Sequence, residues 1–180
     1  QKVTQTKKVV LRKRYWLYYA LQFMGGARRQ IFVVFAAFLM VEKFEFSVGA
    51  ISLLLLANAA INVTLAPKIG RLIHKFGERR SLIFEYVGLA FIFVGYAVVE
   101  SSSFAVFLYI ADHIFFSIAI ALKTYFQKIA DPADIASSAG VSFSINHIAA
   151  VFIPVVFGLI WLYSPSLVFL AGAGMAVLSL

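Results

Sequence analysis

The sequence GRLIHKFGERR at residues 70–80 separates two apolar runs, Phe46–Pro67 and Ser81–Val99. Each run has about 20 residues, the length that an α-helix needs to cross the hydrocarbon core of a bilayer. The stretch between them holds four of the chain's sixteen lysines and arginines. Because short cytoplasmic loops of membrane proteins carry an excess of Lys and Arg, we expect residues 70–80 to be a cytoplasmic loop between two transmembrane helices.

The composition agrees with a membrane protein. Of the 180 residues, 62% are hydrophobic and 13% are charged, against about 45–50% and about 25% in soluble domains. A soluble domain of this size has too little interior to bury so much apolar surface. The net charge of +8 does not indicate a nucleic-acid partner, because most basic residues lie at Lys2–Arg14 and Lys68–Arg80, outside the apolar runs. The absence of cysteine excludes disulfides, thiolate metal sites and cysteine nucleophiles.

Six apolar segments predict an all-α, polytopic membrane protein built as a bundle of six transmembrane helices. The sixth segment has 16 residues and would span about 24 Å as a helix, less than the ~30 Å hydrocarbon core. We therefore expect the chain to be a fragment whose last helix is truncated. The six segments are Tyr15–Val41, Phe46–Pro67, Ser81–Val99, Phe104–Leu122, Ala139–Tyr163 and Pro165–Leu180.

The basic residues alternate between the two ends of this arrangement. The N-terminal arm, the second-to-third connection and the fourth-to-fifth connection together carry 13 of the 16 lysines and arginines. The opposite connections carry only Lys43. By the positive-inside rule, we expect an integral protein of the cell (inner) membrane with the N-terminus and these two loops in the cytoplasm.

The basic stretch resembles the loop signature of the major facilitator superfamily. That signature is a glycine, three residues, an acid, a basic residue, any residue, a glycine, any residue and two basic residues. One position departs from it, because His74 stands where the acid that helps to hold the cytoplasmic gate is expected. The matching residues are Gly70, Lys75, Gly77, Arg79 and Arg80.

The resemblance implies half of a transporter. Members of this family have two six-helix bundles joined by a cytoplasmic linker, and the chain is similar to the C-terminal bundle. Residues 1–14 would then be the end of the linker, and residues 15–180 would form the bundle. The other six-helix half would be a partner, together with the lipid bilayer.

Two arginines lie within the first apolar segment, where charged residues are costly and commonly functional. Gln22, Gly25 and Arg29 fall on one helical face with Tyr18, and Arg28 lies about 100° around the helix from Arg29. Arginine binds carboxylate and phosphate groups in bidentate geometry, so we expect an anionic substrate group here. Either arginine could also be structural, through an ion pair with a neighbouring helix. In the fifth segment, Asn146 is a further candidate for substrate binding.

Other polar residues within apolar segments are candidates for proton coupling or for ion pairs. Asp112 and His113 lie in the fourth segment, and His147 lies in the fifth. An embedded carboxylate can carry a coupling proton or pair with Arg28 or Arg29. The sequence leaves both roles open for Asp112.

We therefore expect a secondary active transporter that moves a small solute, favouring an organic anion, by alternating access. A non-transporting sensor or assembly subunit is an alternative, and an intramembrane enzyme based on Asp112, His113 and His147 is a weaker one. The spacing of these three residues does not resemble a metal site, and there is no phosphate-binding loop of the Gly-rich, Lys-Ser/Thr type. We expect no catalytic residue, metal or cofactor.

Overall fold

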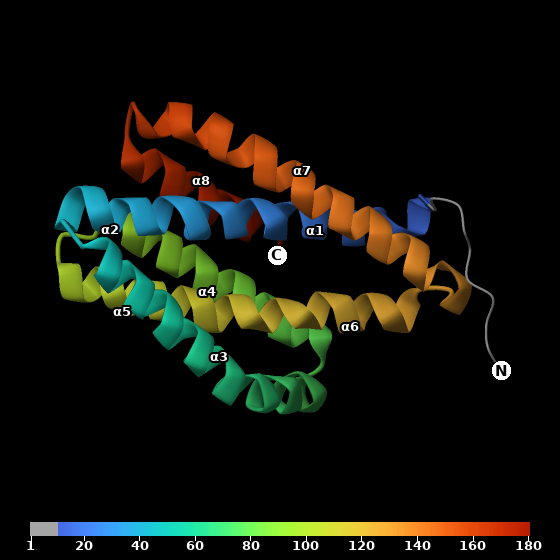
Figure 1. Ribbon diagram of the computed structural model, residues 1–180. Helices are drawn as coiled ribbons and strands as arrows, with labels where there is room; N and C mark the ends of the chain where they lie inside the picture. The colour runs from blue at the N-terminus through green and yellow to red at the C-terminus, as the bar shows by residue number, and fades with distance from the viewer. Residues whose placement is uncertain (1–10) are drawn as a thin grey trace.

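The computed structural model describes residues 11–180, and every element in this range is a helix (Figure 1). The first long helix contains a 3-10 turn at Lys13–Tyr15, α1 (Trp16–Gln30), a π-helical segment at Ile31–Ala36 and α2 (Ala37–Phe44). The remaining elements are α3 (Val48–Phe76), α4 (Glu78–Val98), α5 (Ser102–Phe116), a 3-10 turn (Ser117–Ala119), α6 (Ile120–Ile129), a 3-10 turn (Pro132–Asp134), α7 (Ile135–Trp161) and α8 (Pro165–Leu178).

Five continuous helices are long and apolar enough to cross a membrane. The sixth, α8, is apolar but has only 14 residues. The prediction of an all-α chain with membrane-length apolar helices is confirmed for the described residues. The five helices are Lys13–Phe44, Val48–Phe76, Glu78–Val98, Ser102–Ile129 and Pro132–Trp161.

The prediction of a loop over residues 70–80 is wrong. The helix α3 continues through Pro67 to Phe76, and only Gly77 separates it from α4. Pro67 removes one backbone hydrogen bond, but residues after it such as Leu72 and Lys75 favour a helix, so the helix continues. Gly77 forms the turn with a φ of 83°, a conformation that glycine adopts without a steric penalty.

The helices pack in two extensive pairs. The helix α8 lies antiparallel along α4, and α7 lies parallel along α1, with Tyr15 near Asp134 at one end and Glu42 bonded to Trp161 at the other (Figure 1). Ser166 fixes the start of α8 by donating a hydrogen bond of 2.7 Å to the carbonyl oxygen of Ala97, near the end of α4. In contrast, α3 lies on the outside of the bundle, and only 6% of its most apolar window is buried within the structure.

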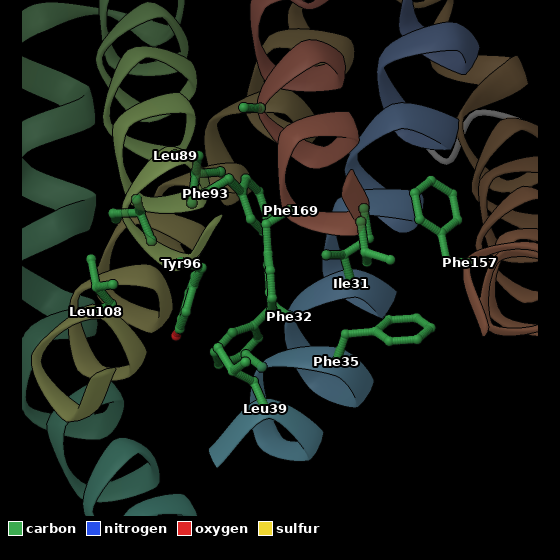
Figure 2. Close-up of a cluster of buried hydrophobic side chains, with 14 of the residues drawn as sticks. Ile31, Phe32, Phe35, Leu39, Leu89, Phe93, Tyr96, Leu108, Phe157 and Phe169 are labelled. Atoms are coloured by element: carbon green, nitrogen blue, oxygen red, sulfur yellow. The ribbon is translucent and has the colours of Figure 1, made fainter. Parts of the chain in front are cut away.

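Two apolar clusters fill the bundle. The large apolar cluster extends from Ala27 to Met40 in the first helix and joins it to α4, α5, α7 and α8. Figure 2 shows its side chains meeting between the helices, with Tyr96 and Phe169 stacked at 5.0 Å. The tyrosine cluster lies nearer the N-terminus and contains Tyr15, Tyr18, Tyr19, Ile73, Leu82, Tyr86, Ala121, Leu122 and Phe126.

Ion pairs connect the helices at both ends of the bundle. At one end, Arg12 Nε lies 2.6 Å from Asp134 Oδ2, and Lys128 Nζ lies 2.6 Å from Glu78 Oε1. The start of the first helix, the α3–α4 turn and the α6–α7 connection therefore lie at the same end, as the charge pattern predicts. At the other end, Lys43 Nζ lies 2.9 Å from Glu100 Oε1.

Asp134 holds the start of the first helix in place. Its side chain is fully buried, and Tyr15 donates a hydrogen bond of 3.0 Å to its Oδ2 atom. The hydrogen bond from Arg12 to this carboxylate raises the pKa of the Arg12 guanidinium above its usual value. The residues just before α1 are thus attached to the connection between α6 and α7.

We predict that Gly88→Ala destabilises the protein by about 1–3 kcal/mol, the usual cost of overpacking a close contact. A Cβ at Gly88 would overlap the ring of Phe115, where α4 and α5 meet. Gly174→Ala is the matched control, because a Cβ at Gly174 has no atom within 4 Å. Unfolding in detergent measures both variants, and equal stability of the two would contradict the close contact.

Candidate functional site

A cavity of about 190 Å³ lies between α1, α4, α7 and the helix formed by α5 and α6. Four residues predicted from the sequence to bind substrate all line it: Gln22, Arg28, Arg29 and Asn146. The structure therefore brings together side chains up to 124 positions apart in the sequence. Their role in binding remains a prediction, but they share one space.

This cavity lies at the boundary between the two apolar clusters. On α1, Gln22 and Gly25 come after Tyr19 of the tyrosine cluster and before Ala27 of the large apolar cluster. On α7, Asn146 comes before Ala149, the first residue of that helix in the large apolar cluster. The bundle thus has a polar layer between two apolar ones.

Arg28 is the most deeply buried cation of the described chain, with 2% of its surface exposed. Its Nη1 atom donates to Ser179 Oγ at 2.7 Å and to the carbonyl oxygen of Met175 at 3.2 Å. Its guanidinium carbon lies 4.7 Å from the centre of the Tyr86 ring, a cation–π contact. Arg28 thereby joins α1 to α4 and to the end of α8.

Arg29 has a different environment. Its side chain is exposed and lines the same cavity, and the closest aromatic contact is the ring of Phe116, 6.0 Å from its guanidinium carbon. It forms no ion pair with the described residues. The two arginines that the sequence could not tell apart are therefore distinct, because Arg28 is held by the protein and Arg29 is available to a ligand.

Glu85 is a site residue that the sequence analysis missed. It follows Arg80 by five residues, but no ion pair joins the two side chains among residues 11–180. Instead, Glu85 is 1% exposed and lines the cavity. Its Oε2 atom has no hydrogen-bond partner among residues 11–180, a loss that costs about 1–3 kcal/mol or more for a charged group. The sequence feature that could have identified Glu85 as a site residue is its position as an acid within an apolar run.

A second cavity of about 220 Å³ adjoins the first and shares Gln22 and Asn146 with it. Lys123 and Gln127 of α6 line it, as do Tyr18 and Ser142. The Tyr18 hydroxyl accepts hydrogen bonds from Gln22 Nε2 at 3.0 Å and from Ser142 Oγ at 2.9 Å. The two shared residues therefore stand between a cavity at mid-helix and one nearer the basic end.

The helix changes its winding directly after the two arginines. Residues Ile31–Ala36 form a π-helical segment, and the amide of Ile31 bonds to the carbonyl oxygens of both Ala27 and Arg28. Such segments are rare and are frequent at functional sites. The apolar sequence of this segment carries no pattern from which we could have predicted it.

Asp112 is fully buried on α5 but does not line either cavity. Arg28 interacts electrostatically with both Asp112 and Glu85. No hydrogen-bonded ion pair joins these side chains in the described chain. The direct ion pair with Arg28 or Arg29 considered for Asp112 is therefore not formed.

The two histidines are not part of one cluster with Asp112. His113 Nε2 lies 3.5 Å from Asn62 Nδ2 of α3. His147 is exposed on α7, and its Nδ1 atom lies 2.9 Å from the carbonyl oxygen of Phe143, one turn earlier. Among residues 11–180, no group of three or more His, Asp or Glu side chains could hold a metal ion.

Apart from Gly77, which forms the turn, the residues predicted to form a gate loop occupy helices instead. Gly70, His74 and Lys75 lie in the last turns of α3, and Arg79 and Arg80 lie in the first turn of α4. His74, at the position where the resembled signature has an acid, is exposed. In the described chain an ion pair next to the α3–α4 turn joins Glu78 to Lys128.

The crossing of α1 and α7 depends on a glycine. A Cβ added at Gly26 would lie 2.7 Å from Asn146 Oδ1 and 3.3 Å from the Cβ of Ala149. A glycine at this position therefore allows α7 to approach closely enough for Asn146 to reach the cavity.

We predict that Gly26→Ala destabilises the protein by about 1–3 kcal/mol and that adding Asn146→Ala removes at least half of that loss. The reason is that the substitution of Asn146 deletes the atom nearest to the new methyl group. A double-mutant cycle by detergent unfolding measures the coupling. Gly25→Ala is the control, because a Cβ there has no atom within 4 Å; the same coupling for Gly25 would contradict the contact.

Comparisons of the chain with protein-family models, with curated proteins and with solved structures give no match. The functional argument therefore rests on the geometry of the two cavities and on the charges that line them.

Proposed function

We propose that the chain is one six-helix half of a secondary transporter of the major facilitator type. In this proposal it moves a small organic solute that carries an anionic group, by alternating access. The observation that carries the proposal is Arg29, a cation with no ion-pair partner in the described chain, on the wall of a cavity within a bundle of membrane-length helices.

The chemistry of Arg29 supports an anionic group on the solute. A guanidinium offers donors in a planar fork that matches a carboxylate or a phosphate. Arg28 would not compete for the same group, because its Nη1 donors are already used by Ser179 and Met175. A bound anion would therefore provide Arg29 with the counterion that the described chain does not supply.

The second cavity supports a path for the solute. It continues from Gln22 and Asn146 toward the basic end of the bundle and adds a cation, Lys123. A positive charge along such a path attracts anions from solution. In the proposed orientation, with the basic end in the cytoplasm, this path connects the first cavity to the cytoplasm.

The uneven burial of the helices supports a partner half. Only 6% of the apolar window of α3 and 17% of that of the α7 helix are buried, against 39% or more for the other three membrane-length helices. In a transporter made of two bundles, α3 and α7 would contact the other half. The cavity would then close only when both halves are present.

We predict that Arg29→Gln lowers the uptake of a small carboxylate by about 10- to 100-fold. This range corresponds to the about 1.5–3 kcal/mol that a hydrogen bond to a charged group contributes. Radiolabelled lactate in proteoliposomes containing the full transporter is the probe, and Lys68→Gln, at an exposed position of α3, is the control. Wild-type uptake by a correctly inserted Arg29→Gln protein would contradict the proposal, and lactate binding without counterflow would favour the sensor alternative.

We also predict the orientation of the helices. The chain has no cysteine, so labelling of a single introduced cysteine measures the accessibility of that one position. A membrane-impermeant maleimide should label Ser101→Cys in intact cells, because this connection has no basic residue. Gln127→Cys, near the basic end, should be labelled only after permeabilisation. The opposite pattern would reverse the proposed topology.

A further inference from the structure

The wall of the first cavity holds an acidic side chain as well as two basic ones. Glu85 on α4 lines the same space as Arg28 and Arg29 on α1. Its side chain is almost completely buried, and its Oε2 atom has no donor in the described chain. A simple anion would satisfy Arg29 but would leave this buried oxygen without a hydrogen-bond donor.

Building on the proposed function, we propose that the solute is a small zwitterion with an amino group next to its carboxylate. The carboxylate binds the guanidinium of Arg29, and the ammonium group donates a hydrogen bond to Glu85. This assignment gives Arg29 a counterion and gives the Oε2 atom of Glu85 a hydrogen-bond donor. It also explains why an acid lies in a cavity otherwise suited to anions.

The role of Arg28 agrees with this assignment. Its hydrogen bonds to Ser179 and Met175 and its contact with Tyr86 fix the guanidinium within the protein. Its electrostatic interaction with Glu85 stabilises the ionised carboxylate without occupying Oε2. Arg28 is therefore a positioning residue, which favours the ionised form of Glu85 and leaves Oε2 to the ammonium group of the solute.

The size of the cavity limits the solute. Its volume of about 190 Å³ is below the roughly 300–1,000 Å³ of pockets for drug-sized ligands. Both charged groups, Arg29 of α1 and Glu85 of α4, line this one small space. A solute with its two charged groups on one carbon, such as a small amino acid, fits both limits.

Three probes of nearly equal size separate the alternatives: L-alanine, L-lactate and propionate. They share a carboxylate and differ at the neighbouring carbon, which carries an ammonium group, a hydroxyl group or a hydrogen. We expect the wild-type transporter in nanodiscs to bind L-alanine about tenfold or more tightly than propionate, because a site built to bond a group rejects analogues that lack it. Titration calorimetry measures the three affinities.

Variants test whether Glu85 causes this preference. Glu85→Gln should lower the ratio of alanine to propionate affinity by about tenfold, whereas Glu78→Gln, on the same helix but outside the cavity, should leave the ratio unchanged. Arg29→Gln should weaken all three probes. If Glu85→Gln does not fold, Glu85→Asp serves, since it keeps the charge but withdraws it from the cavity.

The outcomes distinguish this inference from the proposed function. If propionate and lactate bind as tightly as alanine and Arg29→Gln weakens them, the anion transporter stands and the zwitterion is excluded. The zwitterion is also excluded if none of the three probes binds, or if the preference for alanine survives Glu85→Gln. If Arg29→Gln leaves the affinity for every acid unchanged, the proposed function itself fails.

Discussion

A guanidinium inside an apolar helix bundle must find partners within the protein, and this requirement organises the middle of the molecule. Water is absent from the hydrocarbon core, so an unsatisfied polar group there costs several kcal/mol. Arg28 meets most of the requirement by contacts with Ser179, Met175 and Tyr86, although its Nε atom has no acceptor in the described chain. Those contacts come from α8 and α4, so satisfying one side chain fixes three helices at the same level of the bundle.

The same layer holds groups that the fold does not satisfy. Arg29 has no ion-pair partner in the described chain, and one oxygen of Glu85 has no donor there. Both line a cavity between two well-packed apolar clusters. Natural sequences leave polar groups without partners mainly at functional sites. The contrast between Arg28, which the protein binds, and Arg29 and Glu85, which lack partners, therefore indicates a place for a ligand.

The sequence predicted the helices well and their ends poorly. A membrane-length helix can be predicted from the length and composition of an apolar run alone. All six predicted segments are indeed helical in the structure. The extent of α3 depends instead on the helix-forming residues after Pro67, which a hydrophobicity pattern does not count. The site was predicted in part: its polar residues stand out within apolar runs, but their partners do not. Ser179 lies 151 positions from Arg28, and no local pattern distinguishes Arg28 from Arg29.

The contacts around the site differ in strength, which suggests how the bundle can move. The pairs Lys43–Glu100 and Lys128–Glu78 each include a side chain that is more than half exposed, and exposed pairs contribute about 0–1 kcal/mol. The contacts of Arg28 are buried, so breaking them is more costly. Consequently α1, α4, α7 and α8 should move as one unit around the cavity, because Arg28 joins α1 to α4 and α8 and buried hydrogen bonds join α7 to α1. The helix α3, with only 6% of its apolar window buried, is the one that can shift against this unit.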